Sequence, residues 1–412
     1  MNDPVAPFPT ERLGRVADVI DPQPDHRAPA LSQDAGFAYV GIRDIRSDGS
    51  IDFENARRVD EAAVAKQERS FTIEDGDIAF CRVATLGVPR LVRPEERFAL
   101  SATMALIKPR SIDGKFLFYA LDSLTIRQHI GLVSTGSTRQ AIGIQELRRF
   151  PIPSPPSAIQ RGIADYLDHE TARIDALITA KRRMVELLEE RWRGLRESMM
   201  VTDSVPMAKL GRFVVSIGQG ISPEAEARSV DADEWGVLKL SAVREGRFIP
   251  SEHKALPADF VPVPAMVPRK GDLLISRANT PALVGDACAV TAPAARLMLC
   301  DLIYCLRLAP DLDPEYAAQA LLTNAARGQL SSAARGTSQS MVKLRGEDVK
   351  ATVIPVPTIE RQRSTLNALS HARSRLDLMT DALELSIKLL RERREALITA
   401  AVTGHLDIPE AA

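Results

Sequence analysis

Two stretches of 40 residues decide the fold. Residues 152–191 read IPSPPSAIQRGIADYLDHETARIDALITAKRRMVELLEER, and residues 354–393 read IPVPTIERQRSTLNALSHARSRLDLMTDALELSIKLLRER. They are offset by 202 positions, and 15 of the 49 positions aligned from 152 to 200 are identical. The identities run along the whole stretch: Leu167 with Leu369, His169 with His371, Leu187 with Leu389. Because internal repeats mark duplicated units, we predict one unit of roughly 200 residues, written twice.

The repeat continues upstream in a weaker form. Gly76-Asp77 with Arg82 recurs as Gly271-Asp272 with Arg277. Gly136-Ser137-Thr138 recurs as Gly336-Thr337-Ser338, and the offset drifts between 195 and 202. Such drift is typical of small loop insertions, so each copy should be a variable body followed by a more uniform tail.

Each tail carries apolar residues at the three-and-four spacing of a coiled-coil seam. The stripes are Leu167, Ile174, Leu177/Ile178, Val185, Leu188, Trp192, Leu195 and Met199, then Leu369, Leu376, Met379, Leu383, Ile387, Leu390, Leu397 and Ala401. About 38 helical residues span roughly 57 Å at 1.5 Å per residue. The matching seams favour two rods packed on each other over two ordinary core helices, with Thr403-Gly404 ending the second.

The bodies are predicted to mix strands and helices. Strands are expected at 39–42, 77–80, 237–240 and 272–275, with glycine turns near Gly49 and Gly246, and helices at 116–128 and 314–328. The resulting fold class is α/β, with mixed α+β heads, two long antiparallel coiled-coil helices and a pseudo-twofold repeat. The expected segments are a head at 1–157, a central helix at 158–202, a head at 203–356 and a helix with tail at 357–412.

Composition narrows the class of protein. The apolar fraction is 45%, the charged fraction 26% and the net charge −1, which is ordinary for a globular protein and excludes wholesale disorder. The first head (11–151) has 20 basic and 20 acidic residues, and the second (208–353) has 17 and 16, so neither is broadly basic. With no signal peptide or long apolar run, we expect a cytoplasmic protein. The cysteines, expected reduced and mostly buried, are Cys81, Cys288, Cys300 and Cys305.

Sequence motifs of catalysis are missing. The chain has no GxxxxGK[ST] loop, no GxGxxG, no HExxH and no GxSxG. His169 and His371 share one helical position and are expected to make helix contacts. Glu252-His253-Lys254 resembles a nuclease ExK only superficially, because the first repeat lacks it. We therefore predict a binding protein without an active site, and retain a stand-alone nuclease and a coiled-coil scaffold without a DNA role as alternatives.

At this point the residues resemble a known family. The tail at 152–190 resembles the central helical region of specificity subunits of type I restriction–modification systems, and the ending RERREALITAAVTGHLDI resembles their C-terminal segment. Gly271-Asp272 with Ser276-Arg277, and Arg335-Gly336-Thr337-Ser338-Gln339, resemble motifs of their target-recognition domains. The resemblance covers nearly the whole chain, and it is more specific in the helices than in the heads.

The resemblance implies a division of labour among subunits. Each head would read one half of a bipartite double-stranded DNA target, while the helices set the spacing and dock two methyltransferase subunits. No cofactor is expected in this chain: S-adenosylmethionine would belong to the methyltransferase, and ATP and Mg to the restriction and translocase subunits. A pseudo-twofold axis would match the inverted strands of DNA. A 57 Å rod limits the spread to about 17 base pairs at roughly 3.4 Å each.

Candidate DNA-contacting residues are polar or basic side chains near equivalent glycine turns, because amide, guanidinium and hydroxyl groups read base edges and phosphates. They are Arg43, Arg82, Thr85, Thr138, Arg139 and Gln140 in the first head, and Lys239, Arg277, Asn279, Thr280, Thr337, Ser338 and Gln339 in the second. Candidate partner-binding residues are polar positions of the helices that recur in the repeat: Gln160, Arg161, Arg173, Gln362, Arg363 and Arg375. Since the heads are nearly neutral, tight DNA binding is expected to need the methyltransferase partners.

Overall fold

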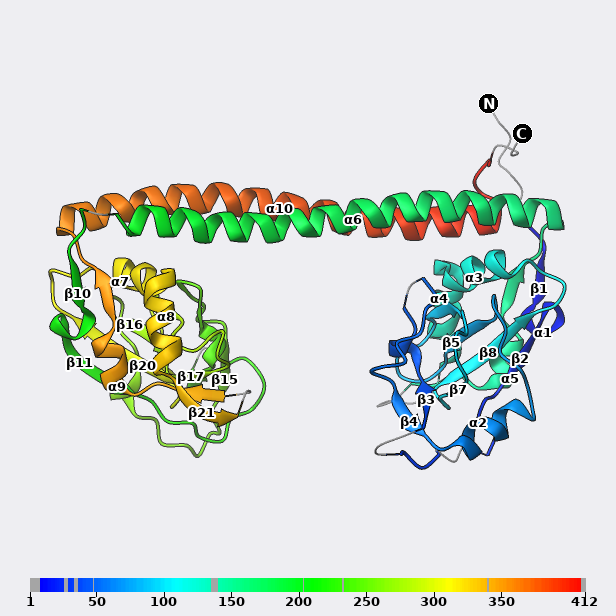
Figure 1. The fold of residues 1–412 in the computed structure, drawn as a ribbon, viewed down its shortest axis with the longest axis horizontal. Coiled ribbons are helices and arrows are strands. Elements are labelled where there is room, and N and C mark those ends of the chain that lie inside the picture. The colour runs from blue at the N-terminus through cyan, green and yellow to red at the C-terminus, as the bar shows by residue number, and fades with distance from the viewer. Residues whose placement is uncertain are drawn as a thin grey trace. The chain divides into compact units, whose positions relative to one another are not determined.

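The computed structural model describes residues 8–25, 29–32, 36–46, 48–134, 140–202, 204–231, 233–338 and 341–408. The chain divides into two units: the first is Met1–Arg182 with Glu384–Ala412, and the second is Arg183–Leu383. Each unit holds one α/β head together with parts of two long helices, α6 (Ser157–Met200) and α10 (Ile359–Thr403) (Figure 1). The mixed heads and the two long helices predicted from the sequence are confirmed.

The described strands of the first head form three sheets. Their strands, in spatial order, are β2 (Ala17–Ile20), β8 (Met104–Pro109), β5 (Ile78–Cys81) and β6 (Pro89–Leu91); then β4 (Arg57–Val59), β3 (Phe37–Val40) and β7 (Phe98–Leu100); then β1 (Thr10–Arg12) with β9 (Pro151–Pro153). Among these, only β3 and β7 pair in parallel. The short helices are α1 (Leu13–Val16), η1 (Ile42–Asp44), α2 (Glu61–Glu68), α3 (Gly114–Asp122), α4 (Leu124–Val133) and α5 (Ile144–Arg148).

The second head repeats this plan and extends it. The matching sheets are β11 (Val214–Gln219), β20 (Ile303–Leu308), β16 (Leu273–Ser276) and β18 (Ala287–Ala289); then β15 (His253–Ala255), β12 (Gly236–Leu238) and β19 (Leu297–Met298); then β10 (Met207–Lys209) with β23 (Val353–Pro355). Two further small sheets are β13 (Val243–Arg244) with β14 (Arg247–Phe248), and β17 (Ala278–Asn279), β22 (Met341–Lys343) and β21 (Arg335–Ser338). Its helices are η2 (Leu210–Arg212), η3 (Leu240–Ala242), η4 (Pro264–Met266), α7 (Pro314–Leu321), α8 (Asn324–Ala333) and α9 (Gly346–Ala351).

Each predicted short helix proves to be two helices. The sequence predicts one helix at 116–128, but α3 ends at Asp122 and α4 begins at Leu124. Ser123 has an extended backbone and its side chain accepts a hydrogen bond from the Ile126 N–H, so it caps α4. The same break separates α7 from α8 at Leu322–Thr323. A serine or threonine within an apolar pattern was the signal for these breaks.

Within each unit the helix segments pack side by side and run antiparallel. In the first unit Ile174 and Ile178 of α6 meet Ile387 of α10, as the seam pattern predicts. Leu177 and Met379 were also assigned to the seam, but their side chains are 45% and 54% exposed. The seam therefore runs through Ile178 rather than its neighbour. Helix α10 ends before Gly404, whose φ of +80° is the left-handed conformation expected after a helix end.

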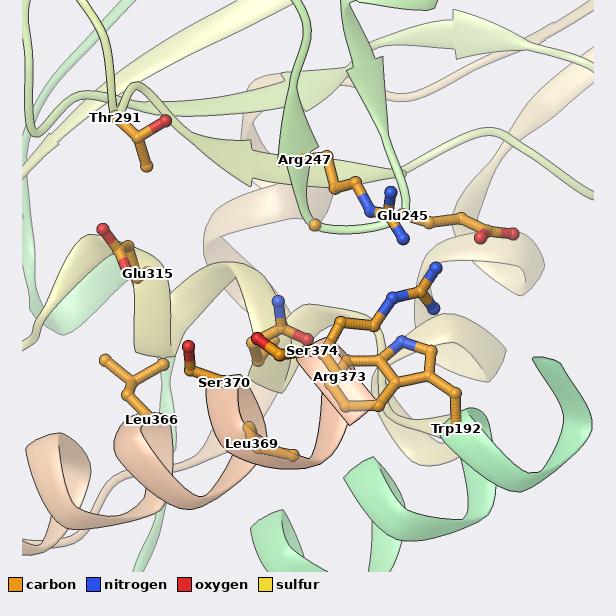
Figure 2. Close-up of a pocket in the computed structure, with 12 residues that line it drawn as sticks. Trp192, Glu245, Arg247, Thr291, Glu315, Leu366, Leu369, Ser370, Arg373 and Ser374 are labelled. Atoms are coloured by element: carbon orange, nitrogen blue, oxygen red, sulfur yellow. The ribbon is translucent and has the colours of Figure 1, made fainter. Parts of the chain in front are cut away.

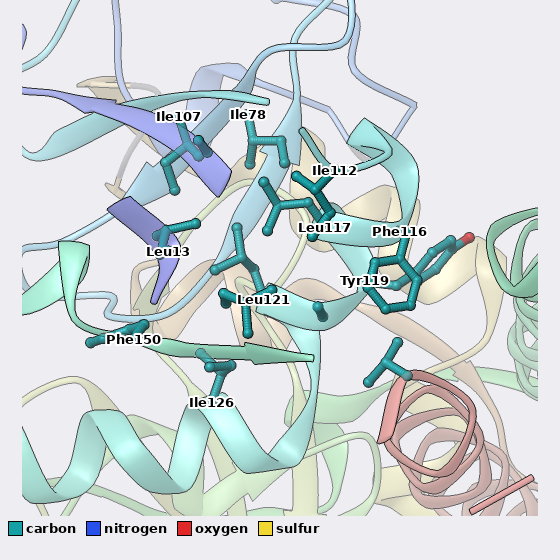
Figure 3. Close-up of a cluster of buried hydrophobic side chains, with 14 of the residues drawn as sticks. Leu13, Ile78, Ile107, Ile112, Phe116, Leu117, Tyr119, Leu121, Ile126 and Phe150 are labelled. Carbon is teal, nitrogen blue, oxygen red and sulfur yellow. The ribbon is translucent and has the colours of Figure 1, made fainter. Parts of the chain in front are cut away.

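The core of each head is continuous with its helices. In the first unit Ile78, Phe116 and Phe150 pack with Leu167 of α6 and Ile398 of α10, all of them buried (Figure 3). The second unit has the counterpart cluster, with these members among others: Leu273, Tyr316, Ile354, Met200 and Leu369. Because each head shares its core with two helix segments, head and helices should unfold together rather than as separate domains.

Candidate nucleic-acid interface

The structure brings the two predicted recognition loops of each head together. In the first head Val83, after β5, forms an antiparallel bridge with Ala141, and the Ala84 N–H donates to the Gln140 carbonyl at 3.0 Å. In the second head Ala278 pairs with Lys343 in the β17–β22 ladder. Offsets of 195 and 202 relate these pairs, so the contact is the same in both repeats. Polar residues that lie far apart in the sequence thus share one surface in each head.

The two equivalent arginines of these loops have different surroundings. Arg82 is only 7% exposed, and its Nη2 donates to both carboxylate oxygens of Asp21, at 3.1 and 3.0 Å. Arg277 is half-buried: its Nε donates to the Tyr304 hydroxyl at 3.1 Å, and its guanidinium lies 5.7 Å from that ring's centroid. Among the described residues, Arg277 has no carboxylate within ion-pair distance. Arg82 is therefore neutralised inside its head, whereas Arg277 keeps an uncompensated positive charge at the surface.

Most other predicted DNA contacts are exposed where the structure describes them. Thr85, Gln140 and Thr280 are exposed, and Asn279 is half-buried with its Oδ1 accepting from the Thr280 N–H at 2.8 Å. Thr337 and Ser338 lie in β21. Thr138, Arg139 and Gln339 lie outside the described residues.

Arg43 and Lys239 do not occupy equivalent positions. Arg43 is exposed within η1, and the matching element of the second head is η3, which begins one residue after Lys239. The Lys239 ammonium lies 3.5 Å from the Glu252 carboxylate, which also accepts from the Ser241 hydroxyl at 2.6 Å. The hydrogen bond from Ser241 and the charge of Lys239 lower the pKa of Glu252. Glu252 is thus engaged in local contacts on the head.

The Gly-Asp motifs have a structural role in both heads. Gly76 and Gly271 adopt φ values of +87° and +89°, which open the tight turns before β5 and β16. Asp77 and Asp272 are buried, and each accepts a 2.8 Å hydrogen bond from the backbone N–H three residues earlier. Asp77 also pairs with Lys108 on the neighbouring strand at 2.7 Å. The Gly-Asp motif therefore holds a strand in place, and its aspartate is not a candidate for DNA contact.

Two predicted partner-binding residues are buried anchors instead. Gln160 is 4% exposed: its Oε1 accepts from the Asp113 N–H at 2.8 Å, and its Nε2 donates to the Pro155 carbonyl at 2.7 Å. Gln362 is fully buried, and its Oε1 accepts from the Asp313 N–H at 2.9 Å. Since no partner can reach these amides, we remove both from the partner-binding set. Their recurrence reflects the same join between head and helix.

The remaining predicted partner contacts are on the helix surface. Arg161, Arg173, Arg363 and Arg375 are exposed, and Arg173 has one contact with Glu170 at 3.7 Å. Sequence reasoning missed an apolar feature of the same surfaces. Leu187 and Leu389 are identical in the repeat, yet their side chains are 46% and 54% exposed. The repeat preserves these two leucines although they lie outside the predicted seam. That combination was the sequence signal for an exposed apolar surface.

A cavity of about 210 Å³ lies where the second head meets its helix segments (Figure 2). Arg373 of α10 lies 5.4 Å from the centroid of the Trp192 ring and pairs with Glu189 at 3.1 Å. Asp377 pairs with both Arg373 at 2.8 Å and Arg247 of the head at 3.0 Å. This chain of charges attaches the β13–β14 hairpin to both helix segments of the unit.

The first unit uses different residues for this attachment. Arg394 stands at the repeat position of Trp192, and it pairs with Asp122 at 3.2 Å and Asp175 at 3.5 Å. Glu197 and Thr399 also correspond, and each accepts from the first N–H of a head helix, that of Asn324 and of Leu124. The contacts between head and helices therefore occupy equivalent positions in the two units but use different side chains.

No three His, Cys, Asp or Glu side chains among the described residues lie close enough to hold a metal ion. No helix in the described part of the chain is long and apolar enough to cross a membrane.

Comparisons with known proteins agree with the resemblance found in the sequence. Residues 32–187 match the family model described as "Type I restriction modification DNA specificity domain". The type I restriction enzyme EcoEI specificity subunit of Escherichia coli is 25% identical over 196 residues, which cover 47% of this chain and 33% of that protein. The EcoKI specificity subunit of Escherichia coli strain K12 is 20% identical over 327 residues, or 75% of this chain and 69% of that protein.

A solved chain shares the fold over the full length. It belongs to the work described as "Structural basis underlying complex assembly and conformational transition of the type I R-M system", has 18% identity and a TM-score of 0.70, and the match covers 98% of this chain and 100% of that chain. The resemblance found in the sequence is confirmed. Residues 32–187 thus match the family of type I restriction modification DNA specificity domains, and the second head repeats the sheet plan of the first.

Proposed function

We propose that this chain is the DNA-recognition subunit of a type I restriction–modification complex, and that each head reads one half of a bipartite target. The observation that carries the proposal is the shared surface of each head, where two loops meet through the same backbone contact in both repeats. The side chains on these loops differ between the heads, and such differences are needed if the two heads recognise different half-sites. Hydroxyl, amide and guanidinium groups are the groups that read base edges and phosphates.

The proposed contacts are the predicted DNA-contacting residues other than Arg82. Those that the structure describes as exposed or half-buried are Arg277, Asn279, Thr280 and Lys239 in the second head, and Thr85, Gln140 and Arg43 in the first. Thr337, Ser338, Gln339, Thr138 and Arg139 are retained from their place in the recurring sequence motifs. Asn279, Gln339 and Gln140 carry amides that suit adenine, and Arg277 suits guanine or phosphate. Arg82 is left out because Asp21 and the Met104 carbonyl already occupy its guanidinium.

The helices supply the spacing and two equivalent docking surfaces. Leu177 and Leu389 are exposed in the first unit, and their repeat counterparts Met379 and Leu187 are exposed in the second. An apolar side chain that stays exposed at the same place in both repeats is suited to a partner. Two equal surfaces predict two copies of one partner, which we propose to be the methyltransferase subunit.

Catalysis is assigned to the partners. Methyl transfer would use S-adenosylmethionine on the methyltransferase, and ATP and Mg would serve the restriction subunits, with the complex acting on DNA in the cytoplasm. Glu252, the only residue with a superficial nuclease motif, lies against Lys239 and Ser241. That position favours a structural role for it over metal-dependent cleavage.

Methylome sequencing tests the proposal. A host carrying this gene with an active methyltransferase gene should show methylated adenine in a two-part motif, and the motif should vanish when the gene is deleted. Replacement of the first head with that of another specificity subunit should change one half of the motif only. An unchanged methylome after deletion would contradict the proposal, and a scaffold without a DNA role predicts that result.

A further inference from the structure

The β21–β22 hairpin of the second head carries an unusual pair of like charges. Arg335 of β21 and Lys343 of β22 are direct partners across the strands, so their side chains leave the same face of the hairpin. Both residues are exposed, and 60% of the Arg335 side chain is accessible. Like charges directly opposite each other destabilise a strand pair.

The surroundings compensate this charge poorly. The Arg335 guanidinium reaches one carboxylate, that of Asp348, at 3.9 Å. The other oxygen of Asp348 already accepts from the Arg345 N–H at 2.8 Å. Lys343 has no acidic partner within ion-pair distance among the described residues, and exposed Arg345 adds a third positive charge two residues further on. The hairpin therefore presents a cluster of positive charges that the acidic groups of its own head neutralise only weakly.

The hairpin also lies beside the proposed base-reading residues. Strand β22 pairs with β17, which places Val342 opposite Asn279 and Lys343 opposite Ala278. Figure 1 shows β17 and β21 at the end of the second head that is remote from the α6 and α10 segments of that unit. A two-stranded ribbon fits the major groove of B-DNA, which is about 12 Å wide.

We propose that this hairpin enters the major groove of the target, with Arg335 and Lys343 binding the phosphates of the DNA backbone. The inference rests on the proposed function and names the element and the cations that position the second head. Phosphate oxygens between the two side chains would relieve their repulsion, because each cation gains a negative partner. Asn279, on the adjoining strand, and Thr280, directly after it, would then face the bases.

Salt-dependent binding of the full chain, assembled with its methyltransferase subunit, to a fluorescein-labelled 40-base-pair duplex of random sequence tests this. Each phosphate contact contributes roughly 0.9 to the slope of log K against log salt. Arg335→Ala with Lys343→Ala should lower the slope by about two relative to the unaltered chain. The control, Lys209→Ala with Lys270→Ala, removes the same charge from exposed positions in β10 and before β16, and should leave the slope unchanged.

A stability measurement separates a binding role from a structural one. Because the pair is repulsive, the double variant should unfold at the same or a higher urea concentration than the unaltered chain, and Arg335→Lys with Lys343→Arg should restore the slope. An unaltered slope in the double variant, or a lost slope accompanied by a lower urea midpoint, would overturn the inference alone. Absence of duplex binding at 25 mM salt by the unaltered chain assembled with its methyltransferase subunit would instead count against the proposed function.

Discussion

Gln362, in the first turn of α10, accepts a hydrogen bond from the backbone N–H of Asp313 at 2.9 Å and has no exposed surface. Its Nε2 donates to the carbonyls of Asp311 and Pro357, both at 2.9 Å. One amide therefore joins the start of α10 to the start of α7 in the head. Gln160 makes the corresponding join in the first unit.

Gln362→Leu should destabilise the second unit by about 3 kcal/mol, because it leaves a buried N–H and two carbonyls without partners. Urea unfolding of the chain alone measures this. The control is Asn367→Ala on the same helix, an exposed amide whose loss should cost less than about 0.5 kcal/mol. Equal stability of the two variants would contradict the anchoring role.

Substitution of the two equivalent arginines should affect different properties: folding stability for Arg82 and DNA binding for Arg277. Arg82→Ala removes one partner of an ion pair whose side chains are 9% and 16% exposed, so it should cost about 3–5 kcal/mol in stability. Arg277→Ala should weaken binding of the assembled complex to cognate DNA by about 1–3 kcal/mol, with a smaller effect on unfolding. Urea unfolding and a DNA titration of both variants check this. Unchanged DNA affinity in the Arg277 variant would remove it from the interface.

The Arg373–Glu189 pair should couple the two helix segments of the second unit. Both guanidinium Nη atoms donate to Glu189, at 3.2 and 3.1 Å, and the side chains are 19% and 33% exposed. A double-mutant cycle with alanine should give a coupling energy of about 1–3 kcal/mol. Lys388 and Glu392, 3.9 Å apart and mostly exposed, are the matched control, expected below about 0.5 kcal/mol. Equal coupling energies for the two pairs would show that the bidentate geometry of the Arg373–Glu189 pair adds no stability.

The four cysteines should be unreactive in the folded chain. Burial raises the pKa of Cys81, Cys288 and Cys305, and it raises the pKa of Cys300 to about 11. At pH 8 the thiolates that react are therefore scarce, and a chromogenic disulfide reagent should titrate four thiols only after urea is added. Because the unfolded thiols ionise first, near pH 8.5, the free energy of unfolding should fall as the pH rises above that value. Rapid labelling of the folded chain would disprove the burial.

The exposed leucines of the helices should control partner number. The proposed docking surfaces predict that Leu187→Glu removes one methyltransferase subunit from the complex and that Leu187→Glu with Leu389→Glu removes both, because a charge replaces apolar contact at equivalent surfaces. Native mass spectrometry of the co-purified complex reports the stoichiometry. Leu132→Glu, at a head position that is 85% exposed, is the control and should keep both subunits. Two bound subunits in the doubly altered complex would exclude these surfaces.

Sequence patterns predicted the elements better than the contacts between them. The apolar stripe through Ile174 and Leu376 predicts the long helices because a seam must bury the same face at every turn. The stripe could not separate Leu177 from Ile178, since adjacent positions both border a seam and only the packed partner decides which one is covered. The predicted helix breaks at Ser123 because the serine side chain can cap a new helix instead of continuing the first one. Packing in the surrounding core decides between these two outcomes.

The duplication, the two long helices and the resemblance to type I specificity subunits follow from the sequence alone, since local spacing and the offset of 202 reveal them. The folded arrangement was needed to separate the recurring polar residues that join head to helix from those that stay exposed. Gln160 and Gln362 recur because the same buried backbone groups need partners, and Arg82 faces Asp21 whereas Arg277 does not. Burial and the partner of a charge arise from residues distant in the chain, so they follow from the folded arrangement and not from the motif.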